Sequence, residues 1–71
     1  MKLRVEFDRE TDGRWIAEVP ELPGVLAYGK TRAAALAAVE ALALRVIADR
    51  IENGELTALP DVLFQSEYGR S

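Results

Sequence analysis

Carboxylates are the leading candidates for catalysis in this sequence, because the chain contains no histidine and no cysteine and its two lysines, Lys2 and Lys30, are expected at the surface. Histidine is the commonest general base and transition-metal ligand, and cysteine supplies thiolate nucleophiles and ligands. Without histidine, the serine and threonine hydroxyls lack their usual activating base. The sequence also has no glycine-rich loop of the kind that binds phosphate. A metal site built from carboxylates is the catalytic chemistry that is left.

Three acids have the placement that a metal-dependent nuclease needs, namely Asp8, Glu40 and Asp61. We expect them at the end of a strand, on a helix and just before a last strand. They would hold Mg²⁺ only if their oxygens converged on one point. Because the chain has 12 acidic residues, three solvated surface acids are the simpler interpretation. We therefore predict no enzyme activity, no metal and no other cofactor, and keep a divalent-metal nuclease as an alternative.

The size and charge of the chain favour a protein partner. It has 71 residues, a net charge of −3 and a pI near 4.8. A single domain this small buries about 60% of the surface that its unfolded chain exposes, so its core gives little stability. Without cysteine no disulfide can help, which leaves association with another chain. The negative charge disfavours direct nucleic-acid binding and suits a basic protein.

The sequence contains no apolar run long enough to span a membrane. A strand pattern starts directly after Met1, which leaves no room for a signal peptide. We therefore expect a cytoplasmic protein that does not enter a membrane.

Alternating apolar and polar residues predict two strands at the start of the chain, over residues 2–8 and 14–19. The Asp12-Gly13 pair between them predicts a hairpin turn. A third strand is expected over residues 25–28, and it stops at Gly29. One face of the first two strands collects the apolar side chains, which are Leu3, Val5, Phe7, Trp15, Ala17 and Val19.

An alanine- and leucine-rich segment without glycine or proline predicts a long helix over residues 32–52. Thr31 is expected to cap its start, and Asn53-Gly54 to end it. Its apolar surface is wider than one small sheet can cover. We therefore predict an oligomer interface on the helix formed by Leu44, Ile47 and Ile51. Residues 62–64 could form a short fourth strand, and residues 66–71 are expected to be a frayed tail.

The segment "PELPG" over residues 20–24 is a rigid corner between the second and third strands. Pro20 ends the second strand, and Pro23-Gly24 suits the middle of a type II turn. Turn formation alone explains these residue types. Alternatively the corner is a preset recognition edge, since prolines reduce the entropy lost on binding. On that interpretation the partner-binding residues are Pro20, Glu21, Leu22, Pro23 and Gly24.

The string "GRWIAEVPELPGVLAYGKTRAAAL" resembles the HicB-like antitoxin family in its aromatic residue, its proline corner and the threonine that opens the helix. The resemblance extends from about residue 2 to residue 61. It implies an α+β, partial ribonuclease-H-like fold of order β-β-β-α-β, with three antiparallel strands, one helix and a fourth strand beside the first. We assign residues 1–65 to this domain and 66–71 to the tail.

The resemblance also implies a function without catalysis. HicB-like proteins bind and mask HicA, a small basic toxin that cleaves messenger RNA with a histidine. Many relatives add a C-terminal DNA-binding module, for which this chain has no room, and they favour acidic residues in the first helical turn, where Arg32, Ala33 and Ala34 stand here. We expect a HicB-like antitoxin that forms a homo-dimer or homo-tetramer. The alternatives are an orphan HicB-like protein that associates only with itself, and the nuclease.

Overall fold

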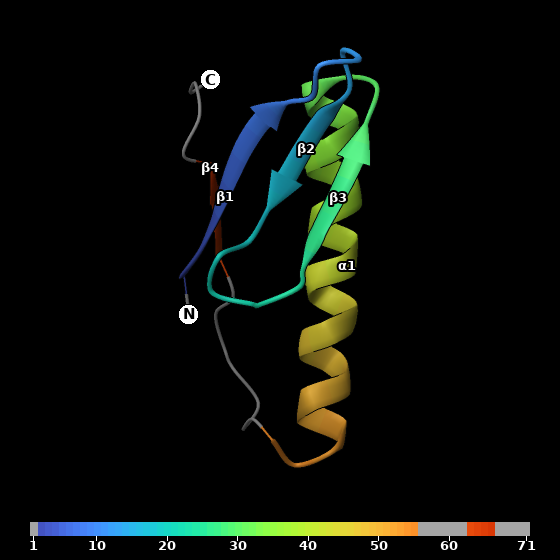
Figure 1. Ribbon diagram of the computed structural model, residues 1–71. Helices are drawn as coiled ribbons and strands as arrows, with labels where there is room; N and C mark the ends of the chain where they lie inside the picture. Colours follow the sequence, from blue (N-terminus) through green and yellow to red (C-terminus); the bar gives the residue numbers. More distant parts are fainter. Residues whose placement is uncertain (1, 56–62, 67–71) are drawn as a thin grey trace.

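The computed structural model describes residues 2–55 and the backbone of residues 63–66. Strands β1 (Lys2–Arg9), β2 (Trp15–Glu18) and β3 (Leu26–Gly29) form an antiparallel sheet, and helix α1 (Arg32–Glu52) lies across one face of it (Figure 1). The C-terminal half of α1 extends beyond the strands. The predicted α+β class, the three antiparallel strands and the single long helix are confirmed.

A short strand, β4 (Leu63–Ser66), lies parallel to β1, so that the strand order is β3-β2-β1-β4. Residues 56–62, which include Asp61, and residues 67–71 lie outside the described part of the chain. Ser66, the first residue of the expected tail, is thus the last residue of β4. The partial ribonuclease-H-like fold that the resemblance implies stays a prediction.

The core lies between the inner face of the sheet and one stripe of α1. Alternate residues of the strands point into it, as the period of two predicted, and Leu3, Val5, Ala17 and Val19 are fully buried. The helix contributes residues spaced four apart along its length, which are Ala35, Val39, Ala43 and Ile47. This spacing is that of one helical face, so a single stripe of α1 meets the sheet.

Trp15 lies at the hairpin end of this core and is half-buried. Its ring meets that of Phe7 edge to face, with 6.4 Å between centroids, and the Arg9 guanidinium lies 5.0 Å from it. Arg32 lies over the other ring, 4.9 Å from the centroid of Phe7. The aromatic pair therefore closes the end of the core, with arginine side chains as its cover.

Both helix ends follow the predicted signals. The Thr31 hydroxyl accepts a hydrogen bond of 3.0 Å from the backbone N–H of Ala34. At the other end the Asn53 N–H donates to the carbonyl of Asp49, and Gly54 adopts a φ of 75°. No acidic residue occupies the first turn. The Thr31 cap therefore stabilises the start of α1, and no acidic side chain in the first turn adds to it.

Gly29 sets the distance between β3 and the start of α1. A Cβ added to it would lie 2.8 Å from the Ala34 carbonyl carbon and 2.9 Å from the Ala35 Cα. Both are backbone atoms of the helix, so they cannot move aside as a side-chain end could. The absence of a side chain at this position allows the first turn of α1 to pack on the end of the sheet.

We predict that Gly29→Ala lowers the free energy of unfolding by about 1–3 kcal/mol, because the helix must shift to admit the methyl group. Urea denaturation followed by circular dichroism measures the change. Lys30→Ala, at the exposed neighbouring position, is the control and should leave the midpoint unchanged. A Gly29→Ala midpoint equal to that of the wild type would contradict this account.

Candidate partner-binding surfaces

The corner over residues 20–24 consists of two successive turns that share Leu22. The Leu22 N–H donates to the Val19 carbonyl, and the Val25 N–H donates to the Leu22 carbonyl, each at 3.0 Å. Pro20 and Pro23 each hold the second position of a turn, where their fixed φ is favourable. Gly24 has a φ of 85°, as a type II turn requires at its third position. The conformation of the corner is therefore set by its own residues.

Leu22 points beneath the corner into the core and is 3% exposed. The sequence prediction placed it among the residues that contact a partner, and burial corrects that assignment. The shared position between the two turns directs its side chain inward, where it anchors the corner to the domain. Binding of a partner by the remaining four residues of the corner stays a prediction.

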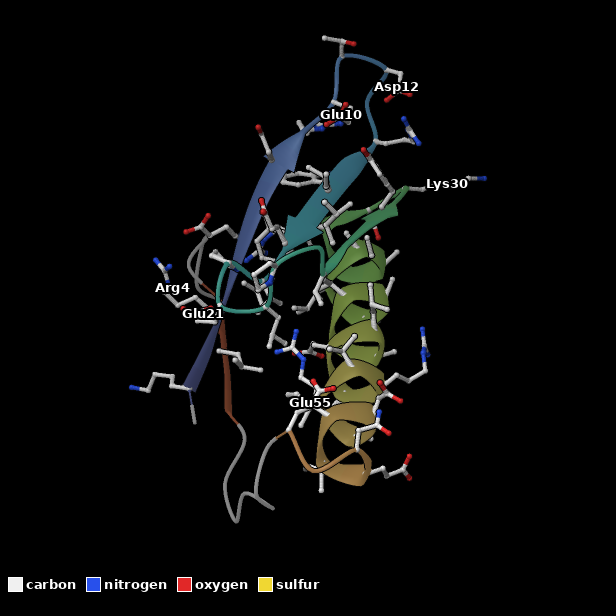
Figure 2. All side chains as sticks on the ribbon, turned by 60° about the horizontal axis from the view of Figure 1, so that its bottom comes forward. Arg4, Glu10, Asp12, Glu21, Lys30 and Glu55 are labelled. Carbon is white, nitrogen blue, oxygen red and sulfur yellow. The ribbon has the colours of Figure 1, made fainter. Side chains whose placement is uncertain are left out.

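Glu21 is the charged group that the corner presents. Its carboxylate accepts hydrogen bonds from the backbone N–H of Arg4 at 3.1 Å and from the Arg4 Nε at 2.7 Å. The β1–β2 ladder begins at the pair Glu6 and Glu18, so Arg4 lies beyond the end of β2. Glu21 thus gives the Arg4 N–H the acceptor that a longer β2 would have supplied. Figure 2 shows the two side chains next to each other, where the corner approaches β1.

The hydrogen bond from the Arg4 side chain is the main reason why the pKa of Glu21 is lowered from its ordinary value of 4.5. A lowered pKa favours the charged carboxylate at neutral pH. The site is exposed to solvent, so salt weakens the interaction. The Arg4–Glu21 pair fixes the direction of the Glu21 carboxylate rather than contributing much to stability.

An open groove of about 480 Å³ separates the corner from the C-terminal half of α1. Pro23 and Gly24 line one wall, Val46 and Arg50 line the opposite wall, and Glu55 contributes after the helix. The groove therefore borders both the predicted corner and the helix. Its walls carry charges of both signs, which favours a polar or mixed occupant.

The exposed flank of α1 is the second predicted surface. Leu44 is 50% exposed, whereas Ile51, seven residues later, is half-buried and packs partly against the core. Four exposed alanines extend this flank with helical spacing, at Ala34, Ala37, Ala41 and Ala48. Ile47 is 4% exposed and belongs to the core stripe, so its assignment to an oligomer interface is corrected. It follows Ala43 by four residues and therefore lies next to it on the stripe that faces the sheet.

The outer face of the sheet carries a third surface, which the sequence analysis did not assign. Leu26 and Tyr28 on β3 are 39% and 44% exposed, and Ile16 lies opposite Tyr28 on β2. Acidic residues adjoin them, because Glu18 lies opposite both Leu26 and Glu6. The alternation that predicted the inner face also implied an outer one. Which residues are neighbours on this outer face depends on the register between the strands, and the sequence pattern did not specify that register.

The three acids of the nuclease alternative are not brought together. Asp8 lies on the outer face of β1, and its carboxylate accepts a hydrogen bond of 2.8 Å from the Arg9 N–H. Glu40 lies on α1, which covers the opposite face, so the sheet separates the two. Asp61 lies outside the described residues. Among residues 2–55, no group of three acids is placed to hold a metal ion.

Within the described part of the chain, no helix is both long and apolar enough to cross a membrane. No family model, curated protein or solved structure matches this chain. The arrangement of its own residues therefore carries the functional argument.

We predict that Glu21→Gln reduces stability at neutral pH but not at low pH. The unfolded state binds a proton near pH 4.5 and the folded state at a lower pH, so the stabilisation present above pH 4.5 is lost as pH falls through the folded value. Urea midpoints of the wild type and the variant should differ at pH 6, and the difference should shrink as the pH falls below 4.5.

Arg4→Met is the matched control for this pair. It removes the contacts of the Arg4 side chain with both Glu21 and Glu6, so the effect of Glu21→Gln should be smaller in the Arg4→Met background than in the wild type. A difference between wild type and Glu21→Gln that is as large at pH 3 as at pH 6 would show that the ion pair is not its source.

Proposed function

We propose that this chain is a HicB-like antitoxin that binds and neutralises a small, basic, HicA-type toxin. The observation that carries the proposal is the corner over residues 20–24, whose two proline turns present Glu21 while Arg4 fixes the direction of its exposed carboxylate. A preset acidic edge loses little entropy when a basic surface binds it. The net charge of −3 adds long-range attraction for such a partner.

The finer features of the family belong to the same proposal. According to this proposal, β4 completes a partial ribonuclease-H-like fold. The protein acts in the cytoplasm, and it works by masking the toxin rather than by catalysis. It needs no cofactor or metal and does not contact nucleic acid directly. The separation of Asp8 and Glu40 gives no support to the alternative of a metal-dependent nuclease.

Self-association through the exposed flank of α1 is the second part of the proposal. Leu44 and Ile51 supply apolar contact, and the alanines beside them allow two helices to approach closely. Burying this flank compensates for the small core of one chain. The same flank favours the alternative in which an orphan HicB-like protein associates only with itself, as a homo-dimer or homo-tetramer.

The first experiment is co-expression of the chain with the product of the adjacent gene. We expect a basic protein of about 60–80 residues with one functional histidine, because a small toxin with such a charge would complement this surface. The two proteins should co-purify, and Glu21→Lys should weaken the complex at least tenfold. Glu52→Lys makes the same charge change at the exposed end of α1 and should bind as the wild type does.

The toxin proposal fails if no basic neighbour co-purifies with the wild-type chain. In that case a chain that still forms oligomers supports the orphan alternative. Cleavage of labelled RNA by the chain with Mg²⁺ or Mn²⁺, abolished by Asp8→Asn, would support the nuclease instead.

Leu44→Glu should convert the proposed oligomer into a monomer, since it places a charge in the centre of the helix flank. Sedimentation at micromolar concentration measures this against the monomer mass of 7.8 kDa. Leu26→Glu is the matched control, because it changes an exposed leucine on the other side of the sheet and should leave the oligomer intact. A wild-type mass of one chain would overturn this part of the proposal.

A further inference from the structure

We propose that the outer face of the sheet is the surface on which the basic partner docks, with Glu18 as its main charged contact. We define this acidic face by Glu6, Asp8 and Glu18 together with the apolar residues Ile16, Leu26 and Tyr28. The proposal rests on the proposed function and names the surface that performs it. None of the described elements covers this face.

Two like charges lie directly opposite each other at the centre of the acidic face. Glu6 on β1 pairs in register with Glu18 on β2, and both are exposed. Carboxylates in this relation destabilise a sheet, whereas an opposite charge or a hydroxyl at either position would stabilise it. The fold itself gains nothing from the pair. A bound cationic side chain between the two carboxylates would remove the repulsion.

The carboxylates of this face differ in the contacts that they already make. The Glu6 carboxylate lies 3.3 Å from Nη1 of Arg4, and the Asp8 carboxylate accepts a hydrogen bond from the Arg9 N–H. The Glu18 carboxylate takes part in no side-chain hydrogen bond or ion pair within the described part of the chain. It is therefore the carboxylate whose charge is most available to a partner.

Two arginines near the ends of the outer face are held by carboxylates. Arg4 contacts Glu21 at 2.7 Å. Arg14 contacts Asp12 at 2.8 Å, and its guanidinium lies 4.5 Å from the centre of the Tyr28 ring. Arg4 also reaches Glu6, so among the central carboxylates Glu18 is the one that neither arginine contacts. A face of this composition complements lysine or arginine side chains.

Apolar contact is available beside the charge. Leu26 lies opposite Glu18 on the neighbouring strand, and Tyr28 follows it on the same face. An arginine or lysine that reached Glu18 could lay its aliphatic stem on Leu26 and its charged end near the carboxylate. Protein interfaces commonly centre on exposed aromatic residues that are bordered by charged groups.

Charge selects a basic protein over the other possible occupants. Nucleic acid would place phosphates against three carboxylates, and a second copy of this chain would bring another acidic face. Arg4 joins Glu21 to Glu6, so the corner and the acidic face form one continuous surface. This surface lies on the side of the sheet opposite α1.

Binding of the purified basic neighbour, measured by calorimetry, tests the proposal with the variants Glu18→Gln and Glu18→Lys. Glu18→Gln should weaken binding about three- to tenfold and Glu18→Lys more than 30-fold, as expected for loss and reversal of a steering charge near a hydrophobic contact. Glu18→Gln should also raise the urea midpoint or leave it unchanged, because it relieves the repulsion with Glu6. Glu52→Lys is the charge-matched control.

The outcomes separate the two proposals. If the wild type binds the basic neighbour and both Glu18 variants bind equally well, the acidic face is not the docking surface and the antitoxin proposal stands. If the wild type binds no basic neighbour, both proposals fail. If Glu18→Lys does not fold, Glu18→Gln decides, since it changes one charge without changing size. Wild-type binding to labelled RNA in place of the neighbour would overturn the choice of occupant.

Discussion

Burial of one face of the sheet against one stripe of α1 is the interaction on which the rest of this structure depends. Leu3, Val5, Ala17 and Val19 meet Val39 and its neighbours on the helix, and these side chains make up most of the core. Two layers have two inner surfaces and two outer ones. Because only the inner surfaces are used for the core, the outer face of the sheet and the outer flank of the helix are both left for other contacts.

The corner over residues 20–24 ties these layers together and shapes one edge of the surface. Leu22 inserts into the core while its neighbour Glu21 reaches Arg4 on β1. Adjacent residues thus perform different tasks, one apolar and inward, the other charged and outward. The two prolines make this division possible, because each turn fixes the direction in which the next side chain points. A flexible loop of the same length would not hold the carboxylate in place.

Much of the fold could be predicted from the sequence because its signals are local. Alternation in residues 2–8 identified the buried face of β1, Thr31 marked the start of α1, and Gly24 marked the turn. The errors concern side chains whose surroundings come from distant parts of the chain. Ile47 is part of the core because residues spaced four apart turn slowly around α1, so the buried stripe reaches this position near the end of the helix. Leu22 is part of the core because it is the residue shared by the two turns of the corner.

The candidate site could be predicted only in part for the same reason. The corner can be recognised in the sequence by its prolines. The acidic face cannot, because it depends on which residues of β1, β2 and β3 lie opposite one another. Glu6 and Glu18 are 12 positions apart, and only the hairpin register makes them neighbours. Single-sequence patterns give the face of each strand but not its pairing partner, so a repulsive pair of this kind becomes visible only in the folded sheet.

The placement of the two outer surfaces also bears on assembly. A second copy bound through Leu44 would lie on the helix side, while a basic partner on Glu18 would lie on the sheet side, so neither occupant blocks the other. A dimer of this chain would then present two acidic faces pointing away from its centre. Each copy would hold one partner, which gives equal numbers of the two proteins. Association of the copies would stabilise each domain without reducing its capacity to bind the basic partner, because one contact uses the outer flank of α1 and the other uses the outer face of the sheet.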